Sequence, residues 1–185
     1  MDAPRAPLKT ADVLVAVDVG TSGARASAFT AAGEQLREVR VPYPTSLPRE
    51  GWAEQDAGRW RGAALSALGR LVRHLGARRR IHAIGLTGQC PSMVPLDAAD
   101  RPLRAGIIYR DNRATAQAEA IRTQFGDDLL HSRTGHVPAA FHVVAKMLWI
   151  REHEPAVFEA THRFVEPSDL VATALTGQPT TDWTM

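Results

Sequence analysis

The hydrophobic positions of this chain predict an α/β fold that opens with strands. Residues 13–19 form a continuous valine-rich run, which is typical of a buried central strand. Residues 24–29 and 36–41 are β-prone and flank the stretch TAAGEQ, which indicates a hairpin turn. We therefore expect three strands, mostly antiparallel, at the start of the fold.

The next pattern is helical. Asp56 is suited to cap a helix N-terminus, and Gly76 is suited to end the same helix. The apolar face expected between them comprises Trp60, Ala64, Leu68, Leu71, Val72 and Leu75. Strands are expected over RIHAIGLTGQ, SMVPLD and AGIIY, the last one stopping at Tyr109. Further helices are expected near 112–125, 127–133, 139–152, 155–160 and 168–175. This succession predicts a layered α/β domain.

Composition narrows the class of protein. The chain has 185 residues, which is enough for one domain with a core, and its net charge is only +2. Without a broad basic face, nothing in the composition favours a nucleic-acid or membrane partner. The single cysteine, Cys90, excludes an internal disulfide and fits a cytoplasmic location. Residues 1–11 are polar and lack an apolar core, so we expect a short disordered lead-in rather than a signal peptide.

The stretch AVDVGTSGAR places a carboxylate, Asp18, at the end of the first strand. Gly20 and Gly23 allow a tight turn that can approach a ligand closely. The amides and hydroxyls of Thr21 and Ser22 can donate to phosphate, and a carboxylate beside bound phosphates can hold Mg²⁺ through water. A plain hairpin turn with a capping aspartate explains the stretch equally well. It is not a Walker loop, because no Gly-Lys-Ser/Thr follows.

Two later stretches also place polar groups just after a strand. GLTGQCPS carries Gln89, and IIYRDNRA carries Asp111 and Arg113. Taken singly, the first is better explained as an ordinary β-turn, and the second as an N-cap aspartate beside a surface arginine. Together the three stretches put polar groups at strand exits, which is where α/β sheets bind ligands.

The motifs VDVGTSGAR, GWAEQD, GLTGQ, YRDNRA, KMLWI and LTGQPTTD occur in the order and spacing of the FGGY carbohydrate kinases, a family that includes glycerol kinase and xylulokinase. The resemblance covers residues 13–185. It implies a partial first lobe over residues 12–185, with the ribonuclease-H-like fold of actin and Hsp70: a mixed sheet flanked by helices, incomplete at its C-terminal side. The implied activity is phosphoryl transfer from ATP to a sugar or polyol hydroxyl.

The resemblance also implies roles for particular residues. Asp18 would belong to the first phosphate loop and help to place Mg²⁺ and ATP, together with Gly20, Thr21, Ser22 and Arg25. The sugar would lie near Gln89, Asp111 and Arg113. Tyr109 stands where the family commonly has tryptophan and would provide a flat wall, and Phe141 stands where members often carry an aromatic ring near the substrate.

Cys90 and Pro91 depart from the family pattern. Glycerol kinases have Arg-Glu at these positions and xylulokinases have Met-His, whereas proline offers no side-chain hydrogen bond. Neither usual set of polyol contacts is therefore complete. Because Asp111 matches the xylulokinase pattern, we hypothesise a pentulose or a similar polyol as the substrate.

Family members are more than twice as long as this chain. The resemblance places the general-base aspartate, the second phosphate loop and the second lobe after Met185, so Asp18 is not assigned as the base and the 185 residues alone are expected to show no kinase turnover. The alternative is a truncated, non-catalytic sugar-binding or interaction fragment, whose exposed surface would favour a homodimer. A nuclease on the same fold would need several converging carboxylates, of which only Asp18 is suitably placed.

Overall fold

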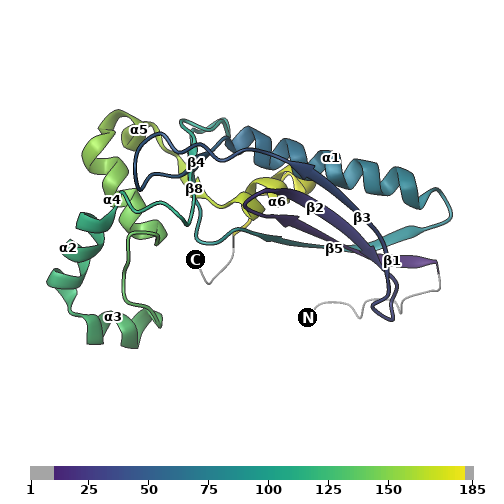
Figure 1. The fold of residues 1–185 in the computed structure, drawn as a ribbon, viewed down its shortest axis with the longest axis horizontal. Coiled ribbons are helices and arrows are strands. Elements are labelled where there is room, and N and C mark those ends of the chain that lie inside the picture. Colours follow the sequence, from purple (N-terminus) through teal and green to yellow (C-terminus); the bar gives the residue numbers. More distant parts are fainter. Residues whose placement is uncertain (1–10, 182–185) are drawn as a thin grey trace.

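A four-stranded mixed sheet forms the centre of the fold in the computed structural model, which describes residues 11–181 (Figure 1). Its strands are β1 (Asp12–Val19), β2 (Gly23–Phe29), β3 (Gln35–Pro42) and β5 (Arg80–Gly88), in the order β3-β2-β1-β5. The first three are antiparallel, as predicted, and β5 runs parallel to β1. The expected lead-in at residues 1–11 lies, except for its last residue, outside the described residues.

The long helix α1 (Ala57–Leu75) packs against β1, β2 and β3. As predicted, Asp56 caps it by accepting a 2.7 Å hydrogen bond from the Gly58 amide, and the helix ends at Gly76. Most of the predicted apolar face is buried, but Val72 is 44% exposed, so its placement in the core was wrong. Neighbouring positions point about 100° apart on a helix, and Leu71 takes the core side.

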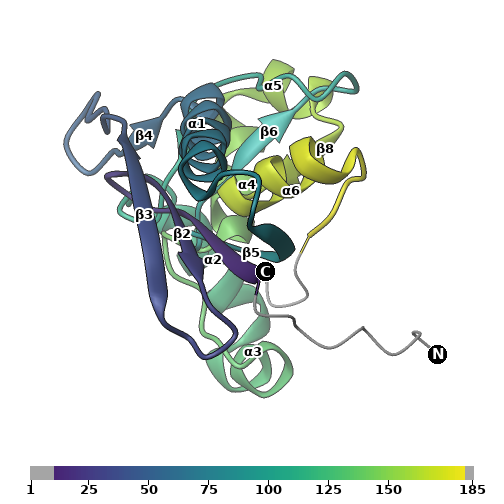
Figure 2. The same cartoon turned by 90° about the vertical axis from the view of Figure 1, so that its right-hand side faces the viewer.

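A second helix, α6 (Pro167–Thr176), lies beside α1 and packs against β1 and β5 (Figure 2). The alternation along β1 follows from this arrangement: Val15, Val17 and Val19 are buried in the core shared with the helices, while Ala16 on the opposite face is exposed. The mixed sheet flanked by helices that the sequence predicted is therefore confirmed.

The remaining helices gather at one end of the molecule (Figure 1). They are α2 (Thr115–Phe125), α3 (Asp127–Thr134), α4 (Val143–His153) and α5 (Pro155–Ala160). A second apolar cluster, which includes Met93, Ile107, Trp149 and Ile150, holds this part together. No helix in residues 11–181 combines the length and apolar character needed to cross a membrane.

Two small antiparallel sheets connect the two ends of the molecule. One pairs β4 (Glu54–Gln55) with β7 (Gly106–Ile107), and the other pairs β6 (Val94–Leu96) with β8 (Arg163–Val165). The strands β4 and β8 were not predicted, because two or three residues are too few to show a periodic pattern. The strand expected to reach Tyr109 ends at Ile107.

Candidate functional site

Two of the three strand exits lie side by side. Because β1 and β5 are parallel, their carboxyl ends meet at one edge of the sheet, where Asp18 lies opposite Thr87. The main-chain amide of Gln89 then donates a 2.9 Å hydrogen bond to the Val19 carbonyl. The structure therefore brings the AVDVGTSGAR and GLTGQ stretches together at the position that the strand-exit argument indicated.

The turn after β1 is held in shape from the side of β3. The Gly20 amide donates to the Gly23 carbonyl at 3.1 Å, and the Tyr43 hydroxyl donates to the Gly20 carbonyl at 2.5 Å. Gly23 has a φ of 155°, and a Cβ there would lie 2.6 Å from the Val41 carbonyl oxygen, so only glycine fits. Burial and the nearby charge of Asp18 raise the pKa of Tyr43, which keeps its hydroxyl available as a donor.

The carboxylate of Asp18 is only loosely paired. The Arg25 guanidinium, opposite it on β2, approaches to 3.5 Å, and the Asp18 side chain is 35% exposed. Arg25 also faces Glu38 at 4.0 Å, which is itself bonded to Arg40 at 2.6 Å. Within residues 11–181 no cluster of three or more histidine, cysteine or acidic side chains could hold a metal alone. One accessible carboxylate is enough for a hard cation such as Mg²⁺, whose other oxygen ligands would come from water and phosphate.

Gln55 connects this turn to the loop after β5. Its side chain is buried, and its amide nitrogen donates to the Thr21 carbonyl and to the Thr45 hydroxyl, both at 2.7 Å. Its side-chain oxygen accepts hydrogen bonds from the indole N–H of Trp60 at 2.7 Å and from the side-chain amide nitrogen of Gln89 at 2.6 Å. Gln55 was not predicted as a site residue, although it lies within GWAEQD, directly before the helix cap.

Gln89 itself carries an unsatisfied group. The residue is 7% exposed, and its side-chain oxygen has no hydrogen-bond partner within the described part of the chain. A buried acceptor of this kind is normally satisfied by a protein donor, by water or by a ligand. Gln89 lies beside the turn after β1, at the carboxyl edge of the sheet.

Asp111 and Arg113 form a buried ion pair. Asp111 accepts hydrogen bonds from the Ala53 amide at 2.6 Å and from the Arg113 guanidinium at 2.8 and 2.9 Å. Arg113 is 1% exposed at its side chain and lies 3.7 Å from the centre of the Trp52 ring. The alternative of an N-cap aspartate beside a surface arginine was wrong, because the N-cap residue of α2 is Ala114.

The pair belongs to a larger group that we call the Arg113 cluster: Glu54, Arg104, Asp111, Arg113 and Glu154. Arg113 contacts Glu54 at 2.7 Å, and Arg104 bonds both to Glu54 and, at 2.8 Å, to Glu154. The cluster ties β4 to the loop after β7 and to the end of α4. Sequence reasoning identified two of its five members. The other three are brought together only by the fold, since Arg104 lies 50 positions from each of its acidic partners.

Tyr109 and Phe141 lie at the surface, and each is about two-fifths exposed. The Phe141 ring packs against the ring of His142, with 4.5 Å between their centres. Burial and the nearby His136 lower the pKa of His142. Contact of Tyr109 and Phe141 with a sugar stays a prediction.

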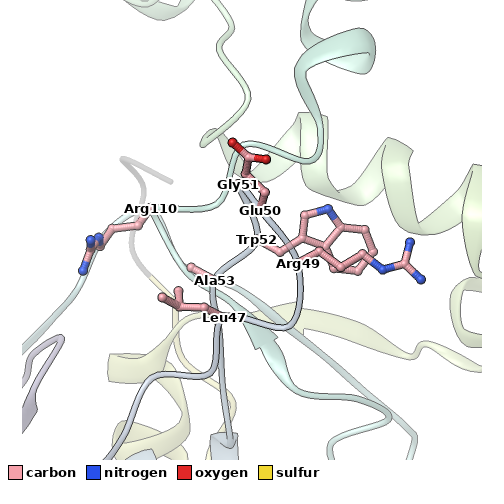
Figure 3. A pocket seen from close by; sticks show the side chains of 7 residues that line it. All are labelled: Leu47, Arg49, Glu50, Gly51, Trp52, Ala53 and Arg110. Atoms are coloured by element: carbon pink, nitrogen blue, oxygen red, sulfur yellow. The ribbon is translucent and has the colours of Figure 1, made fainter.

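An open pocket of about 360 Å³ lies in the loop before β4 (Figure 3). It is lined by Leu47, Arg49, Glu50, Gly51, Trp52, Ala53 and Arg110. Figure 3 shows the side chains of Arg49, Glu50 and Arg110 extending away from its centre. None of the predicted phosphate- or sugar-binding residues lines it. The strand exits joined by Gln55, rather than this hollow, therefore form the candidate site.

Known proteins resemble the chain over nearly its whole length. The sequence profile of the "FGGY family of carbohydrate kinases, N-terminal domain" matches residues 13–185. A xylulose kinase of Bacillus subtilis (strain 168) is 32% identical over 165 residues, which are 89% of this chain and 33% of that protein. The crystal structure of xylulose kinase from Rhodospirillum rubrum matches with a TM-score of 0.88 and 30% identity, covering 92% of this chain and 35% of that one.

The fold extends to more distant proteins. The structure of Plasmodium falciparum glycerol kinase with ADP matches with a TM-score of 0.81 at 15% identity, which shows a shared fold. The chain spans about a third of the length of these relatives.

Proposed function

The chain belongs to the FGGY family of carbohydrate kinases, and we propose that it provides nucleotide- and sugar-binding elements of an enzyme that transfers a phosphoryl group from ATP to a sugar hydroxyl. Its fold is the ribonuclease-H-like fold of the actin-like ATPases, as the resemblance predicted. The observation that carries the proposal is the bridge made by Gln55. One buried side chain binds both the turn after β1 and Gln89, so the two halves of the proposed site are held in a fixed relation.

The nucleotide half would comprise the turn after β1 and the two side chains that flank it. The glycine turn and the groups of Thr21 and Ser22 would donate to phosphate oxygens, and Arg25 would add positive charge. Asp18 would hold Mg²⁺ through water, and the ion would neutralise charge on the phosphates. Phosphoryl transfer depends mostly on such positioning and charge neutralisation. No residue of this chain is assigned as the general base.

The sugar half would centre on Gln89, whose unsatisfied oxygen would accept a hydrogen bond from a substrate hydroxyl. The resemblance to xylulose kinases supports a pentulose as the substrate class. Asp111 and Arg113 would support the site without touching the sugar, because both Asp111 oxygens are already bonded within the protein. Tyr109 and Phe141 would lie at the rim. The single cysteine supports a cytoplasmic enzyme.

The nucleotide half is tested by Asp18→Asn. In the presence of Mg²⁺, we expect ATP to bind the variant about tenfold more weakly than the wild-type chain, because the water-mediated contact to the ion loses its charge. In EDTA the two chains should bind ATP alike. Amide shifts in ¹⁵N NMR spectra report both affinities, and those of residues 20–23 should move. Asp128→Asn, at an exposed aspartate of α3, is the matched control. An equal loss of ATP affinity with and without Mg²⁺ would contradict the role of Asp18.

The sugar half is tested by titrating the chain with D-xylulose, xylitol and glycerol. We expect D-xylulose to shift the main-chain amides around Gln89 (residues 88–92) at the lowest concentration, because the relatives that the chain resembles are xylulose kinases. Gln89→Leu removes the orphaned acceptor and should weaken this binding by about tenfold. Binding confined to glycerol would overturn the proposed substrate class.

The alternative is a non-catalytic sugar-binding or interaction module that forms a homodimer. The edge strand β5 supports it, because Ile84 and Gly85 are exposed and the strand bonds to β1 on one side only within residues 11–181. The two titrations separate the proposals. A kinase element binds both Mg²⁺–ATP and the sugar, a sugar-binding module gives only the shifts caused by the sugar, and an interaction module gives neither set.

A further inference from the structure

A buried lysine reaches the loop that carries Gln89. Lys146 lies on α4 and is completely buried, and it is the only lysine in residues 11–181. Its ammonium nitrogen donates to the Pro91 carbonyl at 2.8 Å and approaches the Ile107 carbonyl at 3.5 Å. These direct partners are neutral backbone groups rather than a carboxylate.

The loop from Gln89 to Met93 includes the residue that Lys146 contacts. Its ends are fixed by the amides of Gln89, Ser92 and Met93, which donate to the Val19 carbonyl, to Glu166 and to the Ile107 carbonyl. Pro91 has no N–H group, so its carbonyl is its only main-chain group that can be anchored. Lys146 binds that carbonyl, two residues from the orphaned oxygen of Gln89.

Titratable groups from three other segments surround the ammonium. Asp111 and Glu166 favour its protonated form, as does Cys90, while Arg113 opposes it. His142, at the start of α4, also faces the lysine. Burial outweighs these carboxylates and lowers the pKa of Lys146 to about 8. A buried cation is unfavourable unless it makes good hydrogen bonds, and an apolar side chain of similar size would fill the same space.

We propose that Lys146 is a positioning residue of the sugar site, which holds the Pro91 carbonyl and thereby fixes the orientation of Gln89. The link to the sugar rests on the proposed function, whereas the hold on the loop does not. Lys146 touches no substrate atom in this scheme, since it is fully buried behind the loop.

Lys146→Met tests the proposal, because methionine keeps the length of the side chain and removes its donors and charge. We expect hydrogen exchange of the loop amides, those of Gln89, Cys90, Ser92 and Met93, to rise about tenfold, while exchange in β1 and β2 stays unchanged. D-xylulose should bind about tenfold more weakly, and Mg²⁺–ATP should bind as to the wild-type chain. Exchange that rises uniformly, or that does not change in the loop, would overturn the proposal.

A second measurement needs no substitution at Lys146. In a Cys90→Ser chain labelled with ¹⁵N-lysine, the two side-chain nitrogens are those of Lys9 and Lys146, and Lys9→Arg assigns them. We expect the amide shifts of residues 89–93 to titrate together with the Lys146 nitrogen, near pH 8. Loop amides that do not follow this titration contradict the proposal. If the wild-type chain binds no pentulose, the proposed function fails, and the exchange and shift data still decide the role of Lys146 in the loop.

Discussion

Replacing Arg113 with methionine is expected to lower the free energy of unfolding by about 3–5 kcal/mol, because it leaves buried carboxylates without their cation. Asp111 is completely buried and takes two of its hydrogen bonds from the Arg113 guanidinium. Glu54 keeps Arg104 but loses the 2.7 Å contact to Arg113. Methionine is similar in length and can still pack against Trp52, so the loss measures the charge rather than the volume.

The matched control is Arg40→Met. Arg40 also makes a short contact to a carboxylate, 2.6 Å from Glu38, but its side chain is 68% exposed. Water competes for both charges there, so we expect a change of about 0–1 kcal/mol. Urea unfolding followed by tryptophan fluorescence measures both variants. If Arg113→Met keeps wild-type stability and loses only sugar binding, Arg113 contacts the substrate directly and the Arg113 cluster is not a structural ion-pair network.

The elements that could be predicted are those long enough to show a period. The valine run of β1, the hairpin strands and the capped helix α1 were predicted to within a few residues. The order of apolar and polar side chains in these elements follows from one feature, which is burial in the sheet or along one face of the helix. The pairings β4–β7 and β6–β8 could not be predicted, since they are set by contacts between segments about 50 or more positions apart.

The candidate site likewise has residues that the sequence indicated and residues that it did not. The sequence placed polar groups at the exits of three strands, and the parallel pairing of β1 and β5 brings two of those exits, with Asp18 and Gln89, to one edge of the sheet. Gln55 and Lys146 gave no such signal. An isolated glutamine, or a lysine within an apolar helix, acquires its role only when the fold supplies a partner from elsewhere in the chain. In both cases that partner is the loop after β5.

Gly106→Ala is expected to destabilise the chain by about 3 kcal/mol, at the upper end of the cost of overpacking a core. A Cβ at this position would lie 2.1 Å from Cη2 of Trp60 and less than 3.0 Å from two neighbouring ring atoms. The indole cannot move aside easily, because Trp60 is fully buried and its N–H group is bonded to Gln55. The same displacement would disturb Gln89, so the affinity for D-xylulose should fall as well.

Two further variants test whether the Trp60 ring causes this loss of stability. Trp60→Phe removes the ring atoms that the new methyl group would strike, so the double variant should be more stable than the sum of the single losses predicts, by about 1–2 kcal/mol. Gly62→Ala, on the exposed side of α1 with no atom near its would-be Cβ, should instead stabilise the chain by about 1 kcal/mol. Additive losses at Gly106 and Trp60 would show that the indole ring does not exclude a side chain at position 106. A coupled pair would show that this glycine sets the position of the ring, and through Gln55 the position of both halves of the proposed site.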